Sequence, residues 1–258
     1  MEKNRLTMGS LFDGIGGFPL AAVRNGITPV WASEIESFPI RVTQKHFPDM
    51  VHVGDITKLD GSKLPPVDII CGGSPCQDVS LAGTRKGLTG ERSGLFFEQI
   101  RIISEMREAD KKRGRTGIAV RPRLAVWENV LGSYSSGTPH GSDFQAVLEA
   151  FLNIEEPHLH VVEPPGGRWE YAGAVLGEKS CVAWVTWNSK HLGVPQERRR
   201  VFLVTDFGGC RSIQVLFVPK SLPGYPAQEQ GAGQAPAGCA GMGSVGPSGV
   251  NPALRGHA

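Results

Sequence analysis

The sequence lacks the features that mark a membrane or exported protein. It has no unbroken apolar run near the roughly 20 residues that a membrane-spanning helix requires. The first residues, MEKNRLTMGS, contain no apolar stretch followed by a small-residue cleavage site, so they do not predict a signal peptide. We therefore expect a cytoplasmic protein with no membrane partner.

Cysteine is also scarce and shows no paired spacing. The five cysteines are Cys71, Cys76, Cys181, Cys210 and Cys239, and they form neither a CxxC pair nor a His/Cys pattern. An odd number without such spacing disfavours a disulfide framework and a zinc site alike. We expect reduced thiols and no metal.

The net charge is small, because the sequence has 27 Lys and Arg residues and 25 Asp and Glu residues. A net charge of +2 does not by itself indicate nucleic-acid binding, since attraction to phosphates depends on local clusters of cations. Two clusters occur, at residues 111–123 and 198–200. The first fits a solvated loop as well as it fits a DNA contact.

The pattern of apolar residues predicts one α/β domain with a mostly parallel sheet and helices on both faces, in the manner of a Rossmann-like fold. The segments MGSLFDG, FPLAAVRNG, TPVWASE, SFPIRVTQKHFP and HVGDIT read as strand, helix, strand, helix and strand. Such alternation requires a parallel sheet with right-handed crossovers. At 258 residues the chain has the length of one large core.

Further elements follow along the chain. VDIICGG and RLAVWENV read as strands, and SGLFFEQIRIISEMREA has the apolar spacing of an amphipathic helix. A second helix is expected from Ser142 to Asn153, and two strands joined by a polar turn are expected over residues 181–207, at a sheet edge.

A change in composition predicts the domain boundary. After Pro219 more than half of the residues are Gly, Ala or Pro, and few large apolar side chains remain to build a core. We expect a catalytic domain over residues 5–219 and a disordered tail over residues 220–258.

A glycine-rich turn, FDGIGGF, joins the first strand to the first helix. Gly14, Gly16 and Gly17 let the backbone approach a bound molecule closely, as nucleotide-binding turns do. The same pattern also occurs in dinucleotide sites and in turns that only pack tightly.

Two acidic residues end the next two strands. Glu34 lies about twenty residues beyond the turn, where a carboxylate can accept hydrogen bonds from ribose hydroxyls. Asp55 in VGDI can reach an adenine amino group, with Ile56 against the ring. Either acid fits a helix N-cap instead, and for Asp55 the two interpretations are equal.

A single thiol follows the fourth strand, in GGSPCQDVS. Ligands of open α/β sheets bind at the carboxyl ends of the strands, which is where Cys76 is expected. A lone cysteine is usually buried filler, however, so the case for Cys76 depends on its neighbours.

Taken together, the motifs resemble those of DNA (cytosine-5)-methyltransferases. FDGIGGF, SEIE, GDI, GGSPCQDVS, RSGLFF, WENV and GVPQERRRVF occur in that family's order, between Ser10 and Val204. The resemblance implies S-adenosylmethionine as cofactor, double-stranded DNA as partner and methyl transfer to C5 of cytosine.

The same resemblance implies four catalytic residues. Cys76 matches the nucleophile that adds to C6 of cytosine, and Glu128 matches the acid that contacts N3 and the exocyclic amine. Arg200 is expected to organise Glu128, and Arg198 to contact the target base or the adjacent phosphate.

For the cofactor, the resemblance carries over nine positions that surround its methionine, ribose and adenine parts. They are Phe12, Gly14, Gly16, Glu34, Ile35, Asp55, Ile56, Pro75 and Leu95. Ile35 departs from the aromatic residue common at its position, which weakens the expected stacking on adenine.

The family's target-recognition region and its closing Gly-Asn segment are not found by eye in the sequence. A target cytosine must be flipped out of the duplex, and groove contacts are needed to do this. Three explanations stand: a truncated product, one part of a split enzyme with a complementary recognition subunit, or a chain that binds cofactor or partners without methylating. A dehydrogenase would not need Cys76, Glu128 and Arg200, and a small-molecule methyltransferase would not need the Pro-Cys-Gln loop.

Overall fold

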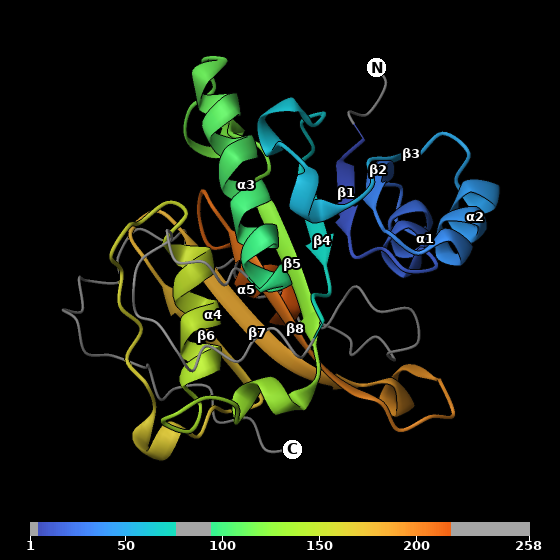
Figure 1. The fold of residues 1–258 in the computed structure, drawn as a ribbon. Helices are drawn as coiled ribbons and strands as arrows, with labels where there is room; N and C mark the ends of the chain where they lie inside the picture. The colour runs from blue at the N-terminus through green and yellow to red at the C-terminus, as the bar shows by residue number, and fades with distance from the viewer. Residues whose placement is uncertain (1–4, 76–93, 218–258) are drawn as a thin grey trace, which may run out of the picture. The chain divides into compact units, whose positions relative to one another are not determined.

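The computed structural model describes residues 5–75 and 94–217. One eight-stranded sheet organises this part of the chain, in the order β3-β2-β1-β4-β5-β8-β7-β6 (Figure 1). The strands are β1 (Thr7–Leu11), β2 (Thr28–Ser33), β3 (Val51–His52), β4 (Ile69–Gly72), β5 (Leu124–Asn129), β6 (Ala172–Leu176), β7 (Cys181–Asn188) and β8 (Arg199–Asp206).

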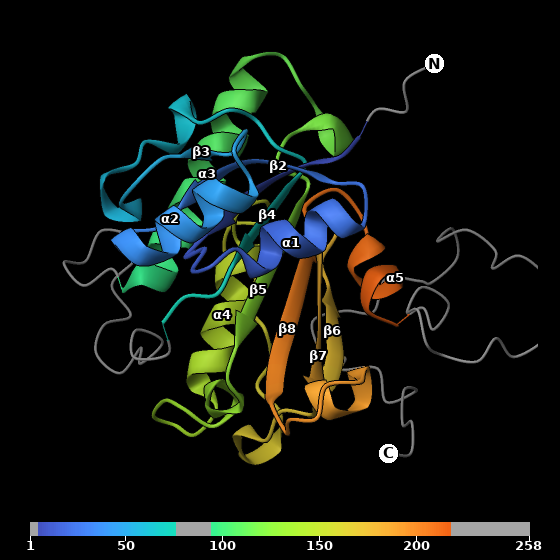
Figure 2. The same ribbon diagram turned by 90° about the vertical axis from the view of Figure 1, so that its right-hand side faces the viewer.

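Helices flank the sheet on both faces. They are α1 (Gly17–Arg24), α2 (Ser37–His46), α3 (Leu95–Lys112), α4 (Ser142–Leu152) and α5 (Arg211–Phe217). Short 3-10 turns are η1 (Ile56–Lys58), η2 (Gly61–Lys63), η4 (Gly117–Ala119), η5 (Leu131–Tyr134), η6 (Pro165–Gly167) and η7 (Ser189–Leu192). Figure 2 shows α1 and α5 in front of the sheet and α3 and α4 behind it. Among the helices of the described ranges, none is long and apolar enough to cross a membrane.

The strand directions confirm the predicted fold class. β1 pairs in parallel with β2 and β4, β2 with β3, and β4 with β5. The last strands differ, since β8 runs antiparallel between β5 and β7, and β6 pairs antiparallel with β7. The described residues up to Leu216 belong to one compact unit. The boundary expected near Pro219 stays a prediction, and the expected tail lies outside the described residues.

The position of β8 corrects the expectation of a hairpin at the sheet edge. β8 is an interior strand, and the edge strand on that side is β6. The physical reason is the burial of its side chains, because Val201 and Leu203 are fully buried on one face of β8 while Val204 is buried on the other. A strand that is apolar on both faces requires cover on both sides.

Three further details were not predicted. β6 and α5 have weak sequence signals, and β3 is shorter than HVGDIT suggested. β3 ends at His52, Gly54 follows two residues later with a φ of 86°, and Asp55 then caps η1. A left-handed residue favours glycine and ends the extended conformation.

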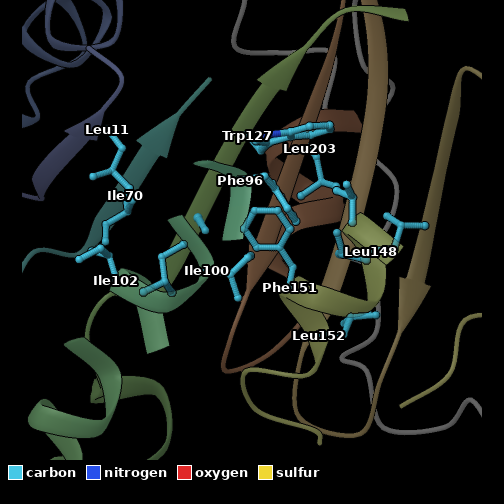
Figure 3. Packing of buried hydrophobic residues seen from close by; sticks show 14 of the residues in the cluster. Leu11, Ile70, Phe96, Ile100, Ile102, Trp127, Leu148, Phe151, Leu152 and Leu203 are labelled. Carbon is cyan, nitrogen blue, oxygen red and sulfur yellow. The ribbon is translucent and has the colours of Figure 1, made fainter. Parts of the chain in front are cut away.

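The main core lies between the sheet and the pair α3 and α4. Phe96 of α3 packs edge-to-face on Trp127 of β5 and on Phe151 of α4, each at a ring distance of 5.9 Å. Figure 3 shows these rings together with Leu11, Ile70, Ile100, Ile102, Leu148, Leu152 and Leu203. Aromatic pairs in this geometry add about 0.5–1.5 kcal/mol beyond burial. The core therefore fixes β4 and β5 against α3.

Candidate active site

The predicted site residues that the structure describes gather at one edge of the sheet. The turn after β1, the residues after β2 and β3, and the segment after β4 all leave the carboxyl ends of neighbouring parallel strands. In open α/β sheets this edge binds ligands. Glu128 near the end of β5 joins the same edge.

The glycine-rich turn has a backbone that a ligand can approach. Phe12 and Gly14 have φ values of 53° and 56°, so two residues of the turn are left-handed, one of them without the freedom of glycine. A Cβ built on Gly14 would meet no atom within 4 Å. Non-glycine residues in this conformation store strain and are concentrated at functional sites.

Glu34 is held in place by three backbone N–H groups. Gly14 N donates to its Oε2 at 2.8 Å, while Ile35 N and Glu36 N donate to its Oε1 at 2.8 and 3.0 Å. A carboxylate has about four acceptor positions. Glu34 therefore links the two turns and keeps acceptor capacity for a ligand hydroxyl.

Asp13 lies in the glycine-rich turn and was not among the predicted site residues. Its side chain is 5% exposed, Ser10 Oγ donates to its Oδ1 at 2.6 Å, and its buried Oδ2 has no hydrogen-bond partner. Burial raises the pKa of Asp13 from 3.8 to about 6; the Ser10 hydrogen bond opposes this shift and the charge of Glu34 adds to it. The only sequence signal was an acid placed inside the glycine-rich turn.

The residues expected around adenine differ in their hydrogen bonds and in how far they are buried. Asp55 Oδ1 accepts hydrogen bonds from Thr57 N and Thr57 Oγ1 at 3.0 and 2.8 Å, so this acid caps η1. These hydrogen bonds lower the pKa of Asp55. Ile56 is only 4% exposed and packs into the main core, whereas Ile35 is 68% exposed. Leu95 begins α3 and is half-buried.

β5 holds the segment that leads to the predicted nucleophile. Trp127 Nε1 donates to Ser74 Oγ at 3.1 Å, and Asn129 Nδ2 reaches the Ser74 carbonyl at 3.4 Å. A Cβ on Gly73 would lie 3.2 Å from Glu128 Oε2. Pro75 is exposed, and Cys76 lies outside the described residues.

The antiparallel pairing of β5 with β8 brings two arginines to Glu128. Glu128 is opposite Phe202, and Arg200 Nε lies 3.1 Å from Glu128 Oε1. Arg198 Nη2 is more distant, at 4.0 Å, and its side chain is 52% exposed. Arg199 instead pairs with Glu197 at 3.1 Å.

At this edge of the sheet the Glu128 carboxylate lies near Arg200 and Arg198. The glycine-rich turn, which has open space beside Gly14, lies at the same edge. Such a site can bind a polar ring through Glu128 and a ligand with hydroxyl and cationic groups through Glu34 and Asp13. In residues 5–75 and 94–217, no group of three or more His, Cys, Asp or Glu side chains lies where it could hold a metal ion.

Comparisons with known proteins identify the family to which this chain is similar. The family model described as C-5 cytosine-specific DNA methylase matches residues 6–206. Over 208 residues the chain is 45% identical to type II methyltransferase M1.ScrFI of Lactococcus lactis subsp. cremoris, which covers 78% of this chain and 43% of that protein.

A phage protein matches over a similar segment. The chain is 30% identical over 220 residues to a protein of Escherichia phage P1 named DNA N-6-adenine-methyltransferase, covering 77% of this chain and 28% of that protein. The chain spans between 28% and 53% of the length of the curated relatives compared with it.

A solved structure has the same fold. It is a DNA modification methyltransferase encoded within an E. coli prophage, with a TM-score of 0.52, 22% identity, and coverage of 84% of this chain and 52% of that one. At this identity the likeness concerns the fold alone.

Proposed function

Because this chain belongs to the C-5 cytosine-specific DNA methylase family, we propose that it carries the chemistry that transfers a methyl group from S-adenosylmethionine to C5 of cytosine in DNA. The observation that carries the proposal is the position of Glu128. Its carboxylate lies beside Gly73, three residues before Cys76, and is paired with Arg200 at 3.1 Å.

The proposed reaction uses Cys76 as nucleophile. Its thiolate forms a bond to C6 of cytosine, and C5 then takes the methyl group from the sulfonium, which leaves as the neutral thioether S-adenosylhomocysteine. A water molecule that acts as base takes the C5 proton, the C5–C6 double bond forms again, and the Cys76 sulfur leaves C6 as thiolate. Covalent addition divides one difficult step into easier ones, because the pyrimidine ring is a poor nucleophile at C5 until sulfur adds.

In this reaction Glu128 binds the edge of the base that carries N3 and the exocyclic amine. A proton shared between the Glu128 carboxyl group and N3 offsets the negative charge that builds in the ring as sulfur adds, which is the kind of stabilisation that a preorganised site supplies. Arg200 positions the carboxylate, and the more exposed Arg198 is placed to contact the base or a neighbouring phosphate.

The residues after β1 and β2 fit S-adenosylmethionine. Gly14 has open space beside its backbone, and Glu34 has acceptor capacity for a ribose hydroxyl. The Oδ2 atom of Asp13, which has no hydrogen-bond partner, can attract a cationic ligand. When bound, the cofactor supplies an electrophilic methyl group. Phe12, Gly16, Ile35, Asp55, Ile56, Pro75 and Leu95 complete the proposed pocket.

The proposed substrate is double-stranded DNA with the target cytosine flipped out of the helix. Extrusion costs a few kcal/mol of unstacking, which contacts to the duplex must repay. The chain spans 43% of its lactococcal relative, so we assign target recognition to sequence beyond the matched segment. A chain that binds cofactor or a complementary subunit but does not methylate alone is the alternative.

The name of the phage P1 relative raises adenine N6 as a second target. Attack by an exocyclic amine on a methyl donor needs no protein nucleophile, whereas the proposed reaction depends on Cys76. The two chemistries therefore differ in whether a covalent protein–DNA adduct forms.

The test is covalent trapping on duplex DNA that contains 5-fluorocytosine, in the presence of S-adenosylmethionine. Fluorine at C5 blocks the final elimination, so we expect an adduct that denaturing gels resolve and that Cys76→Ala abolishes. Cys71→Ala is the matched control, since burial raises the pKa of Cys71 to about 12 and leaves its thiol inert. Methylation of adenine without an adduct would contradict the proposal. A folded, cofactor-binding chain that forms no adduct would favour the alternative.

A further inference from the structure

The basic cluster at residues 111–123 lies at the edge of the sheet opposite the proposed active site. α3 begins at Leu95 on the catalytic edge and contains 18 residues, so it extends for about 27 Å before it ends at Lys112. Figure 1 shows α3 beside β5, reaching the end of the sheet where β5 begins. The cluster therefore does not border Glu128, and the proposed chemistry leaves it unexplained.

Two arginines of the cluster hold the loop that joins α3 to β5. Arg121 Nε lies 2.8 Å from Asp68 Oδ1, and Arg123 Nε lies 3.1 Å from Asp206 Oδ1. Asp206 is fully buried and Asp68 is largely buried, so both pairs anchor the loop to the sheet. The charges of these two arginines are thus used within the fold.

The cations at the start of the cluster instead face a cavity of about 600 Å³. Its walls come from the end of α3, the loop around η4, the segment after α4, the turn between β6 and β7, and the residues after β8. The charged side chains of these walls are four cations and two acids: Arg107, Lys111, Arg115, Lys179, Glu155 and Glu178. The volume lies within the range of about 300–1,000 Å³ that small-molecule sites have.

One wall of the cavity is a fixed ion pair that leaves little free negative charge. Arg107 is 2% exposed, its Nε lies 2.8 Å from Glu155 Oε1, and its guanidinium carbon lies 4.7 Å from the centre of the Phe207 ring. Lys111 Nζ lies 3.0 Å from the same Glu155 oxygen. Because two cations share this carboxylate, it does not oppose an anion in the cavity.

Two other cations keep most of their donors for a ligand. Lys179 is exposed and forms no ion pair within residues 5–75 and 94–217. Arg115 is 40% exposed and reaches Asp110 Oδ2 only at 3.5 Å, so most of its five N–H donors remain available. Glu178 is exposed, and salt in the solvent screens its charge. Arg115 and Lys179 come from different segments and can bind one anionic ligand together.

An apolar side chain completes the lining. Ile118 is 63% exposed although it is large and apolar. A Cβ built on Gly208 would lie 3.2 Å from Ile118 Cα, so the loop around η4 packs directly on the residues after β8. Ligand sites typically combine such apolar surface with a few polar groups that fix orientation. Ile118 therefore offers a surface for a flat ring beside the cations.

We propose that this cavity binds a free nucleotide with two or more phosphates, its base against Ile118 and its phosphates between Arg115 and Lys179. Arginine donates to phosphate through its planar fork, and lysine attracts phosphate as a point charge. A cavity of about 600 Å³ accommodates one nucleotide but not a duplex. The site goes beyond the proposed function, because it lies at the edge of the sheet opposite the cofactor and the target base.

The test is calorimetric titration of the full chain with ADP, with and without excess S-adenosylhomocysteine to fill the proposed cofactor pocket. We expect the same affinity in both titrations, and slower amide hydrogen exchange at residues 115–118 and 207–209 when ADP is bound. Competition by S-adenosylhomocysteine would place ADP in the cofactor pocket and overturn the proposal. A dissociation constant weaker than about 1 mM would also overturn it.

Variants locate the phosphates. Arg115→Glu combined with Lys179→Glu should weaken ADP binding by at least about tenfold, a loss of about 1.4 kcal/mol. Arg41→Glu combined with Lys45→Glu makes the same charge change at exposed positions of α2 and should leave the affinity unchanged. Equal losses in both pairs would reveal a general effect of charge and overturn the site. Thermal unfolding of each variant checks that it is folded.

A duplex without the target cytosine distinguishes the two sources of phosphate. It should not displace ADP; displacement that disappears in the Arg115 and Lys179 variant would assign these cations to nucleic acid and overturn the nucleotide proposal. The outcome is separable from the proposed function. ADP binding without trapping on 5-fluorocytosine DNA would leave this site and reject the chemistry, and trapping without ADP binding would do the reverse.

Discussion

Arg200 Nε lies 3.1 Å from Glu128 Oε1, although 72 residues separate them along the chain. Antiparallel pairing of β5 with β8 creates the contact, because Phe202 is opposite Glu128 and Arg200, two residues before Phe202, points to the same face of the sheet. Arg200 is 22% exposed and Glu128 is 25% exposed, so the pair is partly shielded from water. Glu128 lies on β5, whose backbone is hydrogen-bonded to β4 on one side and to β8 on the other.

Replacing Arg200 should slow the chemistry more than it weakens DNA binding. A hydrogen bond to a charged group contributes about 1.5–3 kcal/mol, so Arg200→Ala should reduce the rate of adduct formation roughly 10- to 150-fold. Arg200→Lys keeps the charge but loses the planar fork and should fall between. Single-turnover trapping measures the rate. Arg199→Ala, which loses only an exposed pair with Glu197, is the control and should change the rate less than about twofold.

Replacing Glu34 should weaken cofactor binding. Glu34→Ala removes the proposed ribose acceptor and also frees Gly14 N and Ile35 N, so affinity should fall by about 1.5–3 kcal/mol, measured by calorimetry. Glu34→Gln keeps the shape and should lose less. Cys76→Ala is the reverse case, with methyl transfer lost and cofactor affinity retained. Unchanged affinity in Glu34→Ala would remove this residue from the proposed pocket.

Asp13 should make stability fall as pH rises. Its pKa is raised to about 6 from 3.8, so the folded protein holds this proton more tightly than the unfolded chain does. The stabilisation is complete below about pH 4 and is lost between about pH 4 and pH 6, with a ceiling of about 3 kcal/mol.

Urea unfolding of the wild type and Asp13→Asn at pH 5 and pH 7 tests this pH dependence. The variant should gain stability relative to the wild type at the higher pH, because amide replaces a buried carboxylate. Asp55→Asn is the control with opposite sign, since the pKa of Asp55 is lowered and its contribution is lost only as pH falls. Parallel pH profiles for the wild type and Asp13→Asn would contradict the argument.

Arg107 should contribute strongly to the stability of the fold. It is 2% exposed, donates through Nε to Glu155 at 2.8 Å and through Nη1 to the carbonyls of Val120 and Pro122. Arg107→Ala leaves two carbonyls without this donor, while Glu155 keeps its ion pair with Lys111 at 3.0 Å, so the loss should be about 1–3 kcal/mol for each buried acceptor that is left unsatisfied. Thermal and urea unfolding measure the loss. Lys63→Ala, which breaks an exposed pair, should cost less than about 1 kcal/mol.

Periodic segments and strand-end motifs could be predicted from the sequence because their signals are local. The expected helix from Ser142 to Asn153 is α4, and RLAVWENV contains β5. The insertion of β8 could not be read this way, because strand neighbours depend on contacts between distant segments. The same holds for Asp13, whose burial depends on packing around the turn and not on its sequence neighbours.

The interior position of β8 sets an order of events on the ribosome. β8 is the last strand of the described chain, and β7 and β6 join the rest of the sheet only through it. At a synthesis rate of about 5–20 residues per second, Glu128 emerges roughly 4 to 14 s before Arg200. During that interval the hydrogen-bonding edge of β5 is open to other nascent chains. Synthesis speed across residues 129–206 therefore bears on how much of the protein reaches the native sheet.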